Sequence, residues 1–139
     1  MAIPEPDMNV WLAEAKRSEN AEMIGMYLTH NGVVRATPRH AVRAEAQAPA
    51  EAPSTDATVT AVDFSYDEKG LAQAVEEALT WDGVYYVRAW LNEGHVAVGG
   101  SLMYVMIGAD IRPHAIAALE RLVGHIKTNL VQEKELFAI

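Results

Sequence analysis

The sequence contains no cysteine. Disulfide bonds, thiolate metal sites and thiol nucleophiles are therefore excluded. It also contains no run of eighteen apolar residues, and its first ten residues, MAIPEPDMNV, have neither the basic region nor the apolar region of a secretion signal. From these absences we expect a soluble cytoplasmic protein without a membrane segment.

Positive charge is also scarce. Eleven lysines and arginines stand against nineteen acidic residues, for a formal net charge of -8. Such a surface repels phosphate backbones and anionic lipids, so we expect no nucleic-acid partner and no membrane partner. Any anion site must be local. The 139 residues are half apolar, which is enough for one core, and we expect a single domain over 1–139.

The hydrophobic periodicity predicts three helices and at least four strand-like stretches. The expected helices are 9–17, 67–80 and a closing helix after Asp110; Asn9, Asp67 and Asp110 are their expected N-caps. The expected strands are 23–35 with a bend at Gly32, 58–66, 84–91, and 95–109 with a break near Gly99. This order predicts an α+β fold in which helices pack on a mostly antiparallel or mixed sheet.

The stretch at about 36–57 differs from the rest of the chain. It is rich in alanine, proline and charge and has almost no large apolar side chain, so we expect a mobile loop. Its beginning, together with Arg35, forms a basic segment: three arginines and His40 lie between Arg35 and Arg43 without a carboxylate. This segment either is a local anion site or is simply solvated.

The closing helix contains the most informative lysine. Only four lysines occur in the chain, and two of them, Lys127 and Lys134, lie seven residues apart near its end. On a helical wheel Lys127 falls about 20° from Ile116. It is therefore expected to project from the apolar stripe, either toward solvent at its rim or into a cavity. Taken alone, the sequence around Lys134 indicates an ordinary solvated charge. The expected stripe is Ile116, Leu119, Leu122, Val123, Ile126 and Leu130.

Arg112 falls near the same stripe but fifteen residues earlier, roughly 22 Å along the axis. If Arg112 and Lys127 serve one site, two copies of the chain would have to supply them, which predicts a homodimer. The five histidines show no metal-ligand spacing. We expect neither a metal nor a resident cofactor.

These segments, in this order, resemble the large, catalytic subunit of molybdopterin synthase. The resemblance extends from about Met23 to Lys134. It rests on three segments: YLTHNGVVR, VTAVDFSYDEKGLAQAVEEA and GADIRPHAIAALERLVGHIKTNLVQEK. In that family the closing helix opens with an arginine, ends near a lysine and is followed seven residues later by a second lysine. The resemblance implies the α/β hammerhead fold of that subunit.

The resemblance also implies a reaction. Sulfur would be transferred from the C-terminal Gly-Gly thiocarboxylate of a small ubiquitin-like carrier to cyclic pyranopterin monophosphate. It implies that Lys127 is the principal catalytic lysine and that Lys134, the second catalytic residue, holds the thiocarboxylate or developing charge. Arg35 would bind the pterin or its phosphate, with Arg39 as a further substrate-binding residue. Arg112 would reach the site from the second subunit.

The sequence supports an alternative function as well. Ile111 stands where the family has a histidine, and LVQEKEL replaces a block that is richer in lysine. These differences favour a noncatalytic paralogue that binds an anionic ligand or a partner protein.

Overall fold

The computed structural model describes residues 3–39 and 57–138. Its first sheet has the strand order β1 (Met26–Val33), β5 (Ser101–Ala109) and β3 (Val84–Leu91), and all pairings are antiparallel. β5 is central and is the most deeply buried strand, in keeping with its nearly continuous apolar sequence. The register of β1 shifts between Gly32 and Val33, which confirms the predicted bend.

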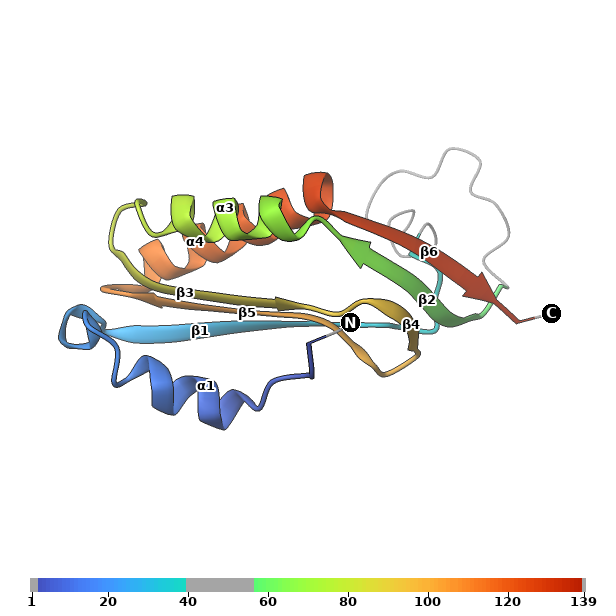
Figure 1. The fold of residues 1–139 in the computed structure, drawn as a ribbon, viewed down its shortest axis with the longest axis horizontal. Helices are drawn as coiled ribbons and strands as arrows, with labels where there is room; N and C mark the ends of the chain where they lie inside the picture. Colours follow the sequence, from blue (N-terminus) through green and yellow to red (C-terminus); the bar gives the residue numbers. More distant parts are fainter. Residues whose placement is uncertain (1–2, 40–56, 139) are drawn as a thin grey trace.

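A second antiparallel sheet extends from the first. Its order is β4 (Gly94–Ala97), β2 (Val59–Tyr66) and β6 (Val131–Phe137). Figure 1 shows β2 and β6 extending side by side beyond the helices, at the end of the molecule where the chain terminates. The predicted α+β class is confirmed. Of the two expected alternatives, mostly antiparallel or mixed, the described strands show the antiparallel one, divided between two sheets.

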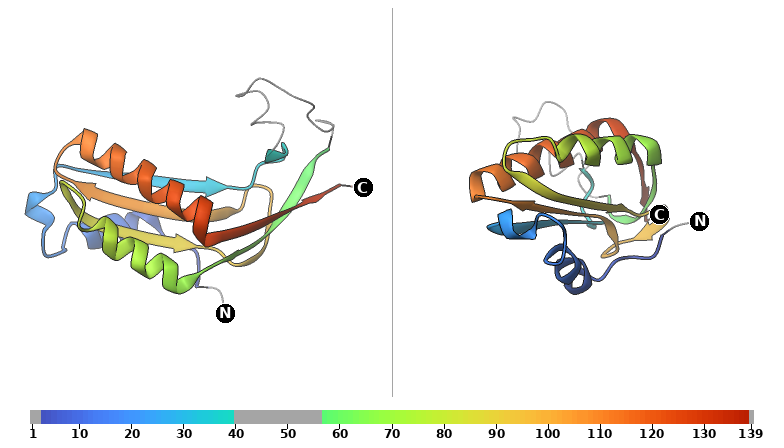
Figure 2. Two further views of the ribbon diagram at one scale, coloured as in Figure 1. Left: turned by 90° about the horizontal axis from the view of Figure 1, so that it is seen from above. Right: turned by 60° about the vertical axis from the view of Figure 1, so that its left-hand side comes forward.

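Helices cover both faces of the first sheet (Figure 1). α3 (Glu68–Ala78) and α4 (Arg112–His125) lie side by side on one face, as the view from above in Figure 2 shows. The core between them and the sheet is continuous with the apolar side of β2. α1 (Met8–Ala15) covers the opposite face, where Trp11 and Ala15 pack against Trp90 and Met106.

Two of the three expected N-caps are corrected by the structure. The Asp67 side chain accepts a hydrogen bond from the Gly70 N–H and caps α3 as predicted. α1 begins earlier than expected, and its cap is Asp7, which accepts from the Asn9 N–H at 2.8 Å. The prediction for Asn9 was wrong because the sequence offers two capping side chains two residues apart, and the chain uses the first.

The third expected cap, Asp110, lies just outside its helix. α4 begins at Arg112, and its N-cap position is Ile111, which makes no side-chain cap. Asp110 instead accepts a hydrogen bond from the Ile111 N–H and contacts His114 Nδ1, both at 2.7 Å. This contact lowers the pKa of Asp110. Gly83, with φ +72, leaves the space that the pair occupies, because a Cβ there would collide with both side chains.

The apolar stripe predicted for the closing helix is partly wrong. α4 buries the small residues Ala115 and Ala118 together with Leu122, whereas Ile116 is 49% exposed. Ala115 and Ala118 lie on the buried face of α4, and Ile116, about 100° further around the helix than Ala115, points toward solvent. The sequence prediction placed Lys127 beside Ile116 on a buried apolar stripe. Because Ile116 is exposed, this argument for the position of Lys127 does not hold.

The chain beyond α4 was not predicted correctly. A π-helical turn, η2 (Ile126–Leu130), follows α4 directly, and β6 continues from it. β6 alternates intermediate and exposed positions from Val131 to Glu135 and carries three charges, so its sequence lacks the apolar signal of a strand. The segment forms a strand because it pairs with β2.

Most of the loop expected at about 36–57 lies outside the described residues. The part before the gap is anchored: the Val59 N–H donates to the Ala36 carbonyl at 2.8 Å, and Pro38 is fully buried. None of the helices in the described part of the chain is long and apolar enough to span a membrane.

Candidate anion-binding site

A cavity of about 420 Å³ opens where the two sheets meet. The end of β1 and the segment after it supply one wall, β6 supplies another, and residues from β2, β5 and η2 complete it. The lining residues are Gly32, Val33, Val34, Arg35, Arg39, Val62, Leu102, Met103, Lys127, Glu133 and Glu135.

Three positively charged side chains line this cavity. Arg35 and Arg39 follow β1, and Lys127 comes from η2, more than eighty residues later in the chain. Arg35 and Lys127 are exposed, whereas Arg39 is partly buried. In a protein whose net charge is -8, three cations around one cavity make it a candidate anion site.

The backbone fixes the position of Lys127. It lies in the π-helical turn between Ile126, which is fully buried, and Leu130, which is 8% exposed. These two apolar side chains anchor the turn in the core and leave the lysine pointing outward. Single π turns occur often at functional sites in proteins. Because regular α-helical geometry ends at this turn, the helical wheel used to predict the position of Lys127 does not apply to it.

Two carboxylates share the cavity with the cations. Glu133 Oε2 accepts a hydrogen bond from Arg39 Nη1 at 2.8 Å, and Glu135 Oε2 accepts one from the Arg39 backbone N–H at 3.0 Å. Residues 133 and 135 are alternate positions of β6 and therefore project to the same face. Arg39 is thus already paired, while neither Arg35 nor Lys127 forms an ion pair in the described part of the chain.

The two other residues singled out from the sequence lie elsewhere. Lys134 projects from the opposite face of β6 and lines a separate cavity with Asp63 and Gln132. Arg112 opens α4, at the end of the helix far from Lys127. The fold therefore gathers Arg35, Arg39 and Lys127 and leaves Lys134 and Arg112 apart. Within the described residues, no three His, Asp or Glu side chains are arranged to hold a metal ion.

His30 was missed by the sequence reasoning. It lies on β1 two residues before Gly32, so its ring projects to the same face of the strand as Gly32. Its Nε2 atom is buried and has no hydrogen-bond partner within residues 3–39 and 57–138. Burial and, secondarily, the positive charge of Lys127 lower the pKa of His30. The sequence signal for His30 was its spacing of two residues from Gly32. This spacing indicates a position near the cavity only once Gly32 is known to line it.

Comparison of the chain with protein-family models and with curated protein sequences finds no match. Solved structures do match. The X-ray structure of molybdopterin synthase from Staphylococcus aureus superposes with a TM-score of 0.71 at 17% identity, over 99% of this chain and 89% of that one. The molybdopterin biosynthesis MoaE protein from Burkholderia ambifaria gives 0.67 at 18% identity, over 99% and 86%.

The chain has the fold of these molybdopterin biosynthesis proteins. A third match belongs to a protein-protein complex of subunits 1 and 2 of the molybdopterin-converting factor from Helicobacter pylori. Its TM-score is 0.63 at 17% identity, over 95% of this chain and 80% of that one. The fold implied by the sequence resemblance is therefore confirmed.

Proposed function

We propose that this chain is a molybdopterin-synthase-like catalytic subunit of molybdenum cofactor biosynthesis. It would accept sulfur from the thiocarboxylated C-terminal Gly-Gly of a small carrier and transfer it to cyclic pyranopterin monophosphate. The observation that carries the proposal is the cavity that joins Arg35, Arg39 and Lys127 on this fold. That a similar fold occurs in a two-subunit complex supports a small protein partner. The cytoplasmic location remains a prediction.

The charges of the cavity suit this reaction. A phosphate and a thiocarboxylate are both anionic, and bringing them together costs electrostatic repulsion unless fixed cations surround them. In this proposal Arg35 and Arg39 hold the substrate anion, and Lys127 moves the proton at the reacting carbon. Since Lys127 is exposed at the cavity, substrate can reach it without a rearrangement of the core.

Lys134 and Arg112 take different places in the proposal. Lys134 is positioned on the far face of β6, where it can contact an incoming carrier rather than the reacting atoms. Arg112 joins a site only if a second copy of the chain supplies it. The proposed assembly is therefore a homodimer that binds one carrier at each site.

A second function is favoured by the carboxylates. Glu133 and Glu135 neutralise part of the cavity, and Glu133 occupies Arg39. A protein with this arrangement and no sulfur transfer would be a binding relative that takes up an anionic ligand or a partner protein.

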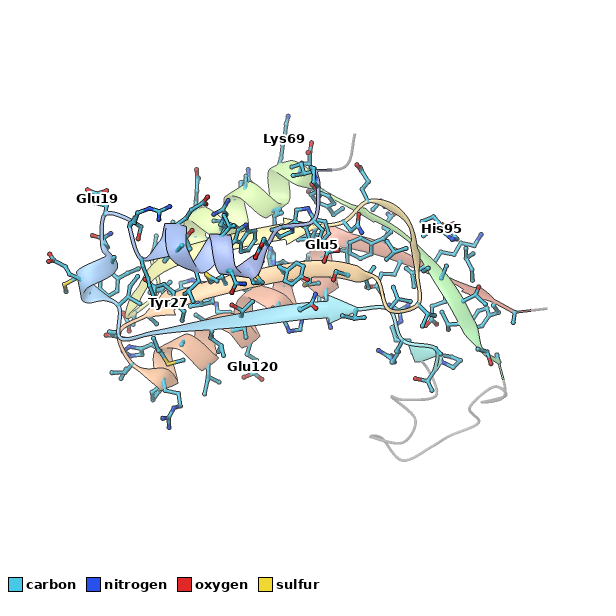
Figure 3. The ribbon with its side chains drawn as sticks, turned by 90° about the horizontal axis from the view of Figure 1, so that it is seen from below. Glu5, Glu19, Tyr27, Lys69, His95 and Glu120 are labelled. Carbon is cyan, nitrogen blue, oxygen red and sulfur yellow. The ribbon has the colours of Figure 1, made fainter. Side chains whose placement is uncertain are left out.

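A single-turnover assay separates the two functions. The protein is mixed with a thiocarboxylated carrier and cyclic pyranopterin monophosphate, and dithiolene product is followed. We expect product with the wild type and with Lys69→Ala, a control that removes an exposed lysine of α3 (Figure 3). Lys127→Ala should lose about 100-fold or more of the rate while keeping its fold, because it removes a proton-transfer group. Wild-type turnover in Lys127→Ala would remove this lysine from the mechanism, and binding without product would favour the second function.

A further inference from the structure

His30 lies close to the lining of the cavity. A Cβ built on Gly32, a lining residue, would come within 3.6 Å of His30 Nε2, so this nitrogen lies on the side of β1 toward which a side chain at Gly32 would point. Among the described residues, the nitrogen has no hydrogen-bond partner. A buried polar atom without a partner costs free energy, and such atoms in native proteins are often explained by function.

The charged groups of the cavity near His30 come from three segments of the chain. Lys127 lies on the side of η2, Arg35 and Arg39 follow the strand that carries His30, and Glu133 and Glu135 belong to β6. The Glu133 carboxylate is bound to the Arg39 side chain. β5 contributes the uncharged Met103 next to Gly32. Of these groups Lys127 is the one whose charge acts on the imidazole, and it opposes protonation.

We propose that His30 is a proton-accepting member of the anion site, so that binding of a dianionic phosphoryl or sulfo group beside Lys127 brings one solvent proton onto His30 Nε2. The ring passes from neutral imidazole, with its proton on Nδ1, to imidazolium. No other bond changes. This inference rests on the anion cavity of the proposed function and adds a fourth cation that exists only in the occupied state.

The direction of the coupling follows from the charges. In the empty site burial and Lys127 both disfavour imidazolium, which keeps the pKa of His30 below its ordinary value. A bound dianion offsets the repulsion from Lys127 and attracts the new charge, so it raises the pKa of His30. By linkage, the affinity for the anion must then increase as pH falls through the range between the free and bound pKa values.

NMR titration of the histidine ring signals tests the coupling in the intact protein. Sulfate is the probe because it remains a dianion across the titration, and the His30 signal is assigned by its loss in His30→Gln. We expect saturating sulfate to raise the pKa of His30 in the wild type and in Lys69→Met. Lys127→Met should raise it without sulfate, because the opposing charge is gone. An unchanged His30 pKa in Lys127→Met, or on sulfate saturation, would overturn the inference.

Calorimetry supplies an independent measurement. Sulfate binding in two buffers of different ionisation enthalpy gives the number of protons taken up. We expect uptake approaching one proton per sulfate within the linkage range, absent in His30→Gln. Sulfate binding with no proton uptake, or no sulfate binding at all, would contradict the inference. Sulfur transfer by a protein without this coupling would leave the proposed function standing, whereas coupling without sulfur transfer would leave only the anion site.

Discussion

Glu133 controls how much positive charge the cavity can offer to an anion. Its side chain is 16% exposed and holds Arg39, whose side chain is 42% exposed. The Glu133 carboxylate is therefore less exposed to solvent than the Arg39 guanidinium. An arriving anion must either share Arg39 with Glu133 or displace the carboxylate. One residue of β6 thus sets the balance between a closed ion pair and an open anion site.

Replacing Glu133 with glutamine should strengthen anion binding. The change keeps the shape of the side chain and removes a negative charge from the cavity, so sulfate affinity should rise several-fold, by roughly 0.5–1 kcal/mol. Calorimetric titration measures it. Glu19→Gln is the control, because it changes the net charge by the same amount. Glu19 lies at the opposite end of the molecule from His95 (Figure 3), so this variant should leave the sulfate affinity unchanged. Equal gains in both variants would assign the effect to net charge and not to Arg39.

Small side chains determine how α4 lies on the sheet. Ala115 is fully buried and Ala118 is 4% exposed, while Leu122 is 1% exposed at the centre of the contact. The helix continues into η2, whose Ile126 and Leu130 enter the same core. The orientation of Lys127 is therefore a consequence of packing along the whole length of α4 and η2.

Two substitutions on α4 distinguish this packing from the predicted stripe. Leu122→Ala removes a buried side chain and should lower the free energy of unfolding by about 2–5 kcal/mol. Ile116→Ala removes an exposed one and should change it by no more than about 0.5 kcal/mol. Denaturant unfolding measures both values. A large loss in Ile116→Ala would mean that another surface covers this residue in the assembled protein.

Arg112 and Lys127 lie far apart in one copy of the chain. They lie at opposite ends of a continuous element formed by α4 and η2, so one copy of the chain does not present both to one cavity. The proposed homodimer would join them across subunits. Two-fold symmetry would then create two equivalent sites, each built from both chains.

Mixing inactive variants tests the shared site. We expect Arg112→Ala and Lys127→Ala each to be inactive in sulfur transfer. After unfolding and refolding together, half of the dimers are mixed and each carries one intact site, so about a quarter of the wild-type activity should return. The separately refolded variants are the control. Activity of Arg112→Ala alone would remove Arg112 from the site, and failure of the mixture to recover activity would contradict a site shared between subunits.

Much of the fold was determined by local sequence. The strand at 58–66, the apolar run of β5, the Asp67 cap and the bend at Gly32 rest on short-range signals, and the structure confirms each of them. The strict alternation expected in 58–66 is wrong, because Ala61 and Val62 are both buried. The basic segment after Gly32 also located two of the cavity cations, Arg35 and Arg39. These features were predictable because backbone propensity and side-chain periodicity act within a few residues.

Tertiary structure alone decided the rest. β6 becomes a strand only by pairing with β2, and the depth of the alanines in α4 depends on the sheet beneath it. Pairing also sends Lys134 to one face of β6 and Glu133 to the other. His30 gains its relation to Lys127 because β1 and η2 meet at the cavity. Such contacts join residues far apart in the chain, and no local pattern encodes which of them will meet.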